Sequence, residues 1–539
     1  MDDYTESSNG QKIREKNIKE CLLVSNLLKT SFGPISMDKM IIDDAGEITT
    51  TNDGANILKR LDMKHPATNI LMNLASQQDE EVGDGTTSVV IIATELLTRA
   101  NELIRNKIHP STVISAYRLA MCYSCSYIRK NLCVSSGQND INTLLNTAKT
   151  SLSSKISGVN SKKFAIIALQ AVKAVQVKEK RSKKICCQIK ALNFTKIQGQ
   201  QMNSSCLVDG FIIPNQKIFS GFSTRISPAR IACLNIDLRR QKMHLGIQAE
   251  TGKTGDIKRI TKQEFEIAKE KARIILNSGA NVVLTTKGMD DFIQKYFLKN
   301  GIIAVRRVSL DNLKKIAMAS GAKIQNTLSN SSINHNFDNL FVGEAEEMFD
   351  QEISKSELLI IRGCRFCPGG TVLLRGATEY LLDEISQSLY DAIYMVKRTI
   401  EGKKIVAGGG STETSLSIAL EKLASSIGKQ EQLPILEFSE AIMSIPKTLA
   451  NNAGLNSADI LAKLRILHTS SVEKNLENYR FFGLDLGSGK IKNNILAGII
   501  EPVLNKIRSI QIATEAAITI LRVDDFIFLK NRKEKKYQS

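Results

Sequence analysis

Several residue types and patterns that mark particular protein classes are scarce in this sequence. It has no tryptophan, five histidines, nine prolines and only 5% aromatic residues among 539. No apolar run approaches the roughly 18–20 residues that a membrane-spanning helix needs. The acidic, polar start MDDYTESSNG has neither the basic nor the apolar stretch of a secretory signal. We therefore expect a cytoplasmic protein that makes no contact with a membrane.

The ten cysteines are an ordinary number for a chain of this length and predict reduced thiols rather than a disulfide framework. They include two CxxC pairs, Cys122/Cys125 and Cys364/Cys367. A four-cysteine zinc site would need both pairs to meet from distant parts of the chain. Cys122 and Cys125 also lie in a helical stretch, where residues three apart simply share a face. We expect no metal at these cysteines.

The net charge of +18 raises the question of a polyanionic partner. Lysine and arginine are concentrated at 178–190 and 530–536, but neither segment is interleaved with the aromatic residues on which single-stranded nucleic acids stack. We expect no specific nucleic-acid partner, and a basic nucleic-acid-binding protein remains the weaker alternative.

The pattern along the chain is helical, then mixed, then helical again, so the fold class is multidomain α and α/β. The 42% of hydrophobic residues is enough for large cores. Apolar strands alternate with helices in the middle of the chain, which predicts an α/β domain with parallel strands inserted into a helical domain. The expected helices are 17–30, 55–61, 65–78, 86–105, 110–131, 262–277, 289–300, 412–427, 433–444, 448–452, 457–468 and 507–521, the expected strands are 231–236, 281–285 and 302–308, and a hairpin is expected at 39–43 and 47–52. The predicted domains are 1–145 with 400–539, the inserted 211–367, and a small connecting domain from 146–210 and 368–399.

The strongest local motif is Gly83-Asp84-Gly85-Thr86-Thr87-Ser88, directly before an apolar helix. Glycines allow close backbone approach, and the free N–H groups at a helix start attract an anion such as phosphate. Asp84 fits beside phosphate if a hard cation such as Mg²⁺ lies between them. The alternative is that Asp84 and Thr86 merely cap the helix. No G-x-x-x-x-G-K-[ST] loop occurs, which excludes the P-loop form of phosphate binding.

Other segments carry a family resemblance when they are read together with this motif. They are 30–59, 77–97, 150–155 (TSLSSK), 388–398 (SLYDAIYMVKR), 406–413 (VAGGGSTE) and 513–525 (ATEAAITILRVDD). In this order and spacing the chain resembles the group II chaperonins, the TCP-1/CCT family, over essentially its whole length. The resemblance implies an equatorial ATPase domain from both chain ends, an intermediate hinge domain, and an apical substrate-binding domain with a helical protrusion near 248–262.

The resemblance also implies ATP and Mg²⁺ as ligands and a set of site residues. Asp84 would hold Mg²⁺. The nucleotide would be bound by Gly33, Gly85, Thr86, Thr87, Ser88, Ser154, Lys155, Gly409 and Glu501. Asp53 and Asp391 would be catalytic, although on their own the first also fits a helix cap and the second a solvated helix position.

The implied activity is ATP-driven folding by a subunit of an eight-membered, hetero-oligomeric double ring, whose clients are unfolded proteins such as actin and tubulin. Two residues depart from the family pattern, Tyr390 in place of a frequent histidine and Ala407 in place of proline. The segment 176–205 is also more basic than the family pattern. A ring subunit that binds nucleotide but has mainly a structural role is the alternative.

Overall fold

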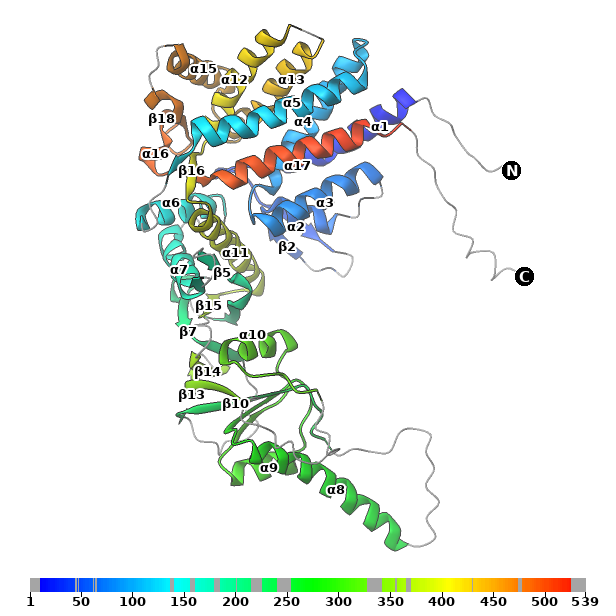
Figure 1. Cartoon of the computed structure of the whole chain (residues 1–539), viewed down its shortest axis with the longest axis vertical. Helices are drawn as coiled ribbons and strands as arrows, with labels where there is room; N and C mark the ends of the chain where they lie inside the picture. Colours follow the sequence, from blue (N-terminus) through cyan, green and yellow to red (C-terminus); the bar gives the residue numbers. More distant parts are fainter. Residues whose placement is uncertain are drawn as a thin grey trace, which may run out of the picture. The chain divides into compact units, whose positions relative to one another are not determined.

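The computed structural model describes most of the chain, and nothing outside the following residues enters the description. They are 10–43, 46, 48–61, 63, 65–135, 140–155, 160–178, 185–199, 201–214, 225–239, 254–326, 342–353, 356–364, 370–428, 430–473 and 477–524. The chain forms two compact units, one from Met1–Leu169 together with Gln387–Ser539 and one from Gln170–Ser386 (Figure 1).

The first unit is mainly helical and contains elements from both ends of the chain. Before the second unit it holds α1 (Gly10–Lys29), β1 (Lys39–Ile42), β2 (Ile48–Thr51), α2 (Gly54–Arg60), α3 (Pro66–Glu81), α4 (Thr86–Arg105), α5 (Pro110–Tyr127), the π-helical η1 (Ile128–Leu132), β3 (Val134–Ser135) and α6 (Ile141–Leu152). After it come β16 (Lys404–Ala407), α12 (Ser411–Ile427), α13 (Gln432–Ile442), α14 (Ser444–Asn452), α15 (Ser457–Glu473), η6 (Glu477–Phe481), β17 (Phe482–Asp485), β18 (Lys490–Asn493), α16 (Asn494–Ala497), β19 (Ile500–Pro502) and α17 (Val503–Leu521). Two helices, α7 (Ser161–Ala174) and α11 (Glu379–Gly402), cross the boundary between the units.

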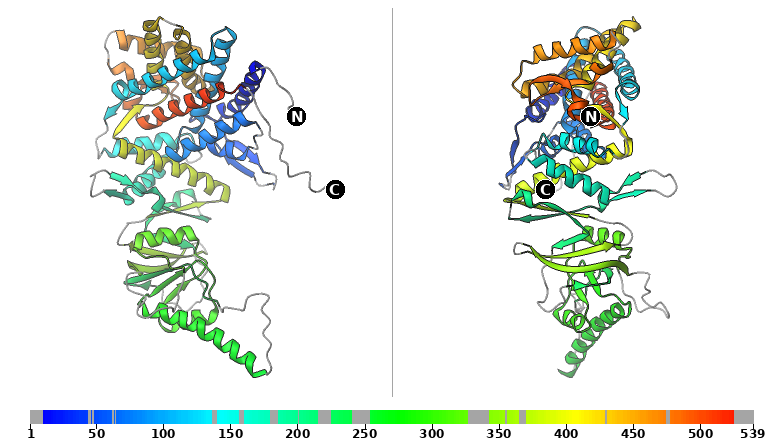
Figure 2. Two further views of the ribbon diagram at one scale, coloured as in Figure 1. Left: turned by 45° about the vertical axis from the view of Figure 1, so that its right-hand side comes forward. Right: turned by 90° about the vertical axis from the view of Figure 1, so that its left-hand side faces the viewer.

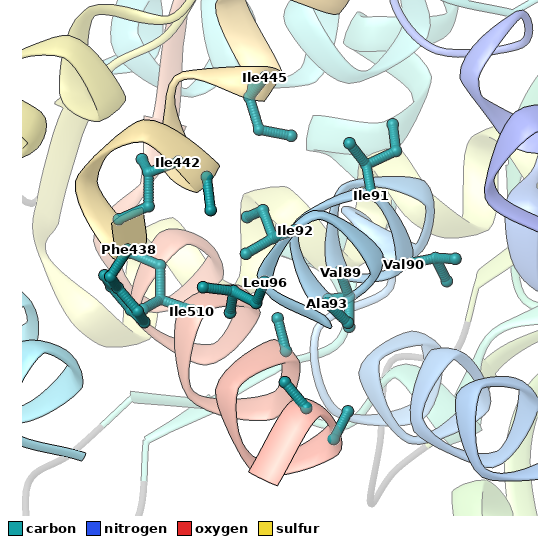
Figure 3. Packing of buried hydrophobic residues seen from close by; sticks show 14 of the residues in the cluster. Val89, Val90, Ile91, Ile92, Ala93, Leu96, Phe438, Ile442, Ile445 and Ile510 are labelled. Atoms are coloured by element: carbon teal, nitrogen blue, oxygen red, sulfur yellow. The ribbon is translucent and has the colours of Figure 1, made fainter. Parts of the chain in front are cut away.

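Helix α4 is the centre of the first unit's core (Figure 3). Its consecutive residues Val89, Val90, Ile91, Ile92 and Ala93 are all buried, as expected for a helix that is apolar on every side. It packs against α17, α1, α13 and α3. The core therefore fixes the start of α4, where the glycine-rich motif lies, against helices from both ends of the chain.

A small sheet brings two further site segments together. Strand β16 pairs antiparallel with β19 and β3, and its register places Val406 opposite Glu501. The glycine run that follows β16 therefore lies beside Glu501, although almost a hundred residues separate them in sequence.

The second unit contains one large mixed sheet and smaller ones. The large sheet has the strand order β12-β11-β10-β13-β14-β8, with β9 beside β13, and its strands β10, β11 and β12 are parallel, as predicted. Its elements are β8 (Phe211–Pro214), β9 (Arg225–Ile226), β10 (Ala229–Leu234), α8 (Thr254–Asn277), β11 (Val282–Thr285), α9 (Asp291–Lys299), β12 (Ile303–Val305), α10 (Leu310–Ser320), β13 (Gly343–Ile353) and β14 (Ser356–Cys364). The smaller sheets are β6 (Asn193–Gln198), β15 (Gly370–Gly376) and β7 (Cys206–Asp209), and the pair β4 (Gln176–Lys178) and β5 (Ile185–Cys187), with the short 3-10 helices η3 (Ile189–Ala191) and η4 (Met202–Ser204) nearby in sequence.

The mixed α and β class predicted from the sequence is confirmed, while the division into equatorial, intermediate and apical domains stays a prediction. The hairpin prediction is also confirmed, with Lys39 opposite Thr51. Helix α8 corrects a boundary, because it begins at Thr254 rather than at Lys262 (Figure 2). The residues directly before Lys262 are polar and give little apolar periodicity to mark a helix, and the single Gly255 costs the helix only about 1 kcal/mol and does not end it.

Other boundaries differ by less. Helix α1 begins seven residues before the predicted Asn17, and β12 ends at Val305 rather than Val308. Cys367, the basic tail and the start of the predicted protrusion lie outside the described residues. Within the described helices, none is both long enough and apolar enough to cross a membrane.

Candidate active site

A cavity of about 540 Å³ in the first unit gathers nearly all of the site residues expected from the sequence. Those in its wall are Gly33, Asp53, Asp84, Gly85, Thr86, Thr87, Ser88, Ser154, Lys155, Gly409 and Glu501. Asp391 is not in the wall but contacts Lys155, which is. Segments from both ends of the chain therefore form one pocket around the start of α4.

The glycine-rich motif forms the turn that starts α4. Gly85 has a left-handed backbone, with φ of 83°, and a Cβ there would lie 2.8 Å from the side-chain oxygen of Asn505. Only glycine fits such a position without strain. The N-cap residue of α4 is Gly85, which has no side chain to cap the first turn, and the Asp84 carboxylate accepts a hydrogen bond from the N–H of Gly85 at 2.6 Å. The first N–H groups of α4 are thus available to an anion.

Asp53 caps a helix, which is one of the two interpretations that the sequence allowed, and it also lies in the cavity wall. Its carboxylate caps α2 by accepting hydrogen bonds from the backbone N–H groups of Ala55 and Asn56, each at 3.4 Å. It also accepts one from the hydroxyl of Thr86, at 3.1 Å. The cap therefore fixes the Asp53 carboxylate at the cavity wall, beside the start of α4.

Asp391 lies on α11 and is buried, with 3% of its surface exposed. It forms an ion pair with the ammonium of Lys155 and accepts a hydrogen bond from Gln387 at 3.4 Å. The solvated position considered for it from the sequence is therefore wrong. Burial raises the pKa of Asp391, and the positive charge of Lys155 opposes that rise. A raised pKa makes a carboxylate a better proton acceptor, provided it stays ionised.

A buried charge cluster in the cavity wall was not predicted from the sequence. Lys506 contacts the carboxylate of Glu413 at 2.7 Å and that of Glu501 at 3.0 Å. Burial raises the pKa of Glu501, and the charge of Lys506 opposes the rise. Spacing could not reveal this cluster, because Glu413 lies on α12 and Lys506 on α17.

The residues present fit a magnesium ion that is shared with phosphate. Asp84 offers a carboxylate, and Thr86, Thr87 and Ser88 offer hydroxyl oxygens, which are the hard ligands that Mg²⁺ prefers. Over the described part of the chain, no group of three or more His, Cys, Asp or Glu side chains could hold a metal by itself. Mg²⁺ at this site would therefore take its remaining ligands from water and substrate, as Mg²⁺ commonly does.

Comparison with known proteins gives one consistent result. The model of the TCP-1/cpn60 chaperonin family matches residues 24–531. T-complex protein 1 subunit alpha of Arabidopsis thaliana is 45% identical over 521 residues, which cover 96% of this chain and 95% of the relative. The protein of the same name from Tetrahymena pyriformis is 39% identical, with 98% and 97% covered, and a thermosome subunit of Pyrococcus abyssi is 35% identical, with 98% and 93% covered. The chain belongs to the TCP-1/cpn60 chaperonin family.

Chaperonins of this family hydrolyse ATP to drive protein folding, and this chain is an ATP-dependent folding chaperone of that kind. The first departure from the chaperonin pattern, Tyr390, packs its ring against Tyr394 with centroids 5.1 Å apart. Burial raises the pKa of Tyr390 to about 12, so its hydroxyl stays protonated at neutral pH. The second, Ala407, is a buried residue of β16 whose carbonyl accepts a hydrogen bond from Thr412 at 2.8 Å. Neither departure removes a group from the cavity wall.

Proposed function

We propose that this chain is an alpha-type subunit of a hetero-oligomeric, eight-membered double ring that binds, encloses and folds unfolded proteins in the cytoplasm. Actin and tubulin are the expected clients. The segments 107–120, 230–248 and 279–297 are those in which the sequence most resembles alpha subunits. The observation that carries the proposal is the cavity of about 540 Å³, because the glycine-rich motif and the side chains of Asp53, Asp84 and Lys155 line a single space.

The phosphate end of ATP would bind at the start of α4. The backbone N–H groups there and the side chains of Thr86, Thr87 and Ser88 are donors for phosphate oxygens, and Gly33, also in the cavity wall, would contact the nucleotide near the phosphates. Asp84 would hold Mg²⁺, which supplies charge neutralisation between phosphate oxygens when it is bound. Ser154 and Lys155 would sense the phosphates, while Gly409 and Glu501 would contact the sugar and base.

Hydrolysis needs an oriented water and compensation of negative charge. We assign the orientation of the water to Asp53 and Asp391. Lys155 supplies positive charge at this place. Burial alone would lower the pKa of Lys155, but the nearby carboxylates of Asp391, Asp84 and Asp53 raise that pKa by more. Lys155 therefore stays protonated, and it can exchange its contact with Asp391 for one with a phosphate oxygen.

Ring assembly would use the hairpin β1–β2. Its side chains Met40 and Ile42 are each 65% exposed, and an isolated two-stranded hairpin is only marginally stable. The free strand edges would pair with a neighbouring subunit. The first half of α8 would form the helical protrusion that closes the cavity of the ring over a client.

The test compares rings that carry wild-type subunit with rings in which Asp53 and Asp391 of this subunit are both replaced by asparagine. We expect purified rings of high native mass that hydrolyse ATP and, when ATP is present, protect a bound client from protease. Doubly substituted subunits should assemble and bind ATP but lose their own hydrolysis. Normal hydrolysis at the substituted subunit would refute the catalytic assignment. A wild-type subunit that binds ATP but shows no turnover would instead favour the mainly structural role.

A further inference from the structure

Helix α3 ends directly before the glycine-rich motif, and its last turn has no positive charge of its own. That turn contains Asp79, Glu80 and Glu81 and no basic residue. The carbonyl oxygens at the end of a helix have no partner within the helix and carry a partial negative charge, to which neighbouring acidic side chains add. The end of α3 is therefore a place where a donor and a cation from another element are favourable.

Arg398 on α11 supplies both. Its guanidinium donates a hydrogen bond to the backbone carbonyl of Glu81, and one of its nitrogens lies 3.5 Å from the carboxylate of Glu401 on the same helix. The Arg398 side chain is 24% exposed, and its Nε is buried without a hydrogen-bond partner among the described residues. A buried N–H that lacks a partner is unfavourable, so the stability of this contact alone does not explain the placement of Arg398.

A second residue of α11 contacts the glycine-rich motif itself. Gly83 has a left-handed backbone, with φ of 81°, and a Cβ there would lie 2.6 Å from the Cβ of Tyr394. The turn and α11 thus approach each other so closely that no side chain fits between them. The position of the turn relative to α11 is therefore fixed at this point.

The third contact of the same helix is the ion pair between Asp391 and Lys155. Asp391, Tyr394 and Arg398 follow one another at intervals of three and four residues, which places them on one face of α11. All three lie in the part of α11 that belongs to the first unit. One helix face therefore contacts the Lys155 side chain, the turn and the end of α3.

We propose that Arg398 is a positioning residue for ATP hydrolysis, which docks α11 on the end of α3 and so fixes the carboxylate of Asp391 relative to the phosphate-binding turn. The inference rests on the proposed function, because it assumes that Asp391 orients the attacking water. Both sides of the contact lead directly to the site, since Glu81 is followed by the turn and α11 carries Asp391 about two helical turns before Arg398. Arg398 itself is not in the cavity wall, so it acts through the place of Asp391. A displacement of about 1 Å at a reacting group lowers a rate by up to about a hundredfold.

The experiment measures hydrolysis and ATP binding separately at this subunit within the assembled ring. 8-Azido-ATP is bound with Mg²⁺, cross-linked after different times and read on this subunit after denaturing electrophoresis. The loss of a γ-phosphate label relative to an α-phosphate label gives the hydrolysis rate, and displacement of the α label by unlabelled ATP gives the affinity.

Arg398→Met should slow hydrolysis about tenfold, because α11 loses its dock, and should change the affinity for ATP by less than about twofold. Arg398→Lys keeps a cation and a donor and should recover most of the rate. If Arg398→Met does not assemble, Arg398→Gln takes its place, because it also removes the charge and shortens the side chain. The matched control is Lys397→Met. Lys397 is the next residue of α11, and its ammonium pairs with Glu401 of the same helix, so hydrolysis should be unchanged.

A double variant separates positioning from general damage to the fold. Once Asp391 is replaced by asparagine, Arg398 has no carboxylate left to position. Arg398→Met combined with Asp391→Asn should therefore hydrolyse ATP at the same slow rate as Asp391→Asn alone. A structural role would instead lower the rate of the double variant by the same factor again.

The outcomes distinguish this inference from the proposed function. If Asp391→Asn hydrolyses ATP at the wild-type rate, the catalytic role proposed for Asp391 is wrong, and the role of Arg398 is refuted with it. If Asp391→Asn is slow but Arg398→Met is as fast as wild type, only the role of Arg398 is refuted. That role is also refuted if Arg398→Met loses affinity as much as rate, if Arg398→Lys is as slow as Arg398→Met, or if the two substitutions act additively.

Discussion

The side-chain amide of Gln78 donates a hydrogen bond to the backbone carbonyl of Asp84, at 3.0 Å. The same nitrogen lies 3.1 Å from the side-chain oxygen of Asn505 on α17, and Gln78 is completely buried. One amide at the end of α3 thus ties the glycine-rich turn to a helix from the other end of the chain. The shape of the turn depends on this amide as well as on its own glycines.

Replacing Gln78 by methionine, which has a similar shape but no donor, should weaken Mg·ATP binding. The carbonyl of Asp84 and the amide oxygen of Asn505 would lose a buried donor, which costs about 1–3 kcal/mol in stability and loosens the turn. Isothermal titration and thermal melting measure both effects. Gln77→Met is the control, because Gln77 is the neighbouring but exposed residue, and its hydrogen bond goes to Glu81. Equal effects of the two substitutions would show that Gln78 does not act on the turn.

Asp391→Asn should lower hydrolysis by this subunit roughly a hundredfold or more while ATP binding stays close to normal, since a general base contributes on that scale. 8-Azido-ATP that is cross-linked to this subunit reports on this subunit alone. Hydrolysis removes a label on the γ phosphate but not one on the α phosphate, so comparing the two labels measures hydrolysis. Asp383→Asn is the matched control. Asp383 lies on the same helix but is exposed and pairs with Lys196. Loss of the γ label at the wild-type rate in Asp391→Asn would exclude a catalytic role.

Asp84→Ala should weaken nucleotide binding itself and raise the Mg²⁺ concentration needed for it. The reason is that the carboxylate at the cavity wall is the group we assign to the cation. Titration of ATP binding at several Mg²⁺ concentrations measures the effect. An unchanged affinity and Mg²⁺ dependence would show that Asp84 does not hold the cation.

Acid should destabilise the first unit through His468. Burial lowers the pKa of His468 from 6.5 to about 4, and its ring nitrogens contact Ser415 and the carbonyl of Phe482, each at 2.8 Å. The unfolded chain therefore binds more protons between these two pH values. The stability from this group is complete above pH 6.5 and is lost as the pH falls toward 4, with about 2 kcal/mol gone at pH 5.

The measurement is the urea concentration at the midpoint of unfolding, at pH 7 and at pH 5, with unfolding monitored by circular dichroism. His468→Gln should be less stable at pH 7 but should show a smaller loss between the two pH values than the wild type. His109→Gln is the control, because His109 is exposed. An equal pH dependence of wild type and His468→Gln would contradict the prediction.

Replacing residues 254–261 by a Gly/Ser linker should leave ATP binding and ring assembly intact, because these residues form the first part of α8 in the second unit, whereas the cavity belongs to the first. Protection of a bound client from protease in the presence of ATP should fail at this subunit. A linker of the same composition replacing 262–269, which removes the buried Ala268, should instead damage the second unit. Full protection by rings with the first replacement would show that this segment does not close the cavity.

The sequence predicted the local part of the site well because its signals are local. Gly85 before Thr86, followed by an unbroken apolar run, located the start of α4 at the residue where the structure has it. The parallel strands were likewise visible in alternating apolar segments. The start of α8 was not, because the polar residues before Lys262 include few apolar side chains that would mark a helix face.

The contacts that hold the site together could not be predicted in the same way. Nothing near Lys506 in the sequence points to Glu413, and nothing near Gln78 points to Asn505. Each pair meets only because α12, α17 and α3 pack in one unit. The family resemblance named the residues that would touch the nucleotide, but not the buried residues that set their positions.

The contribution of both chain ends to one core has a consequence for synthesis on the ribosome. Helix α4 is made early, yet α17, which covers it, is among the last elements to emerge. Until then the apolar face of α4 that α17 will bury lacks its partner. The apolar face of α4 must therefore be shielded from aggregation for most of the translation of this protein. A prematurely terminated chain that lacks α17 would expose that face permanently and would be a target for degradation.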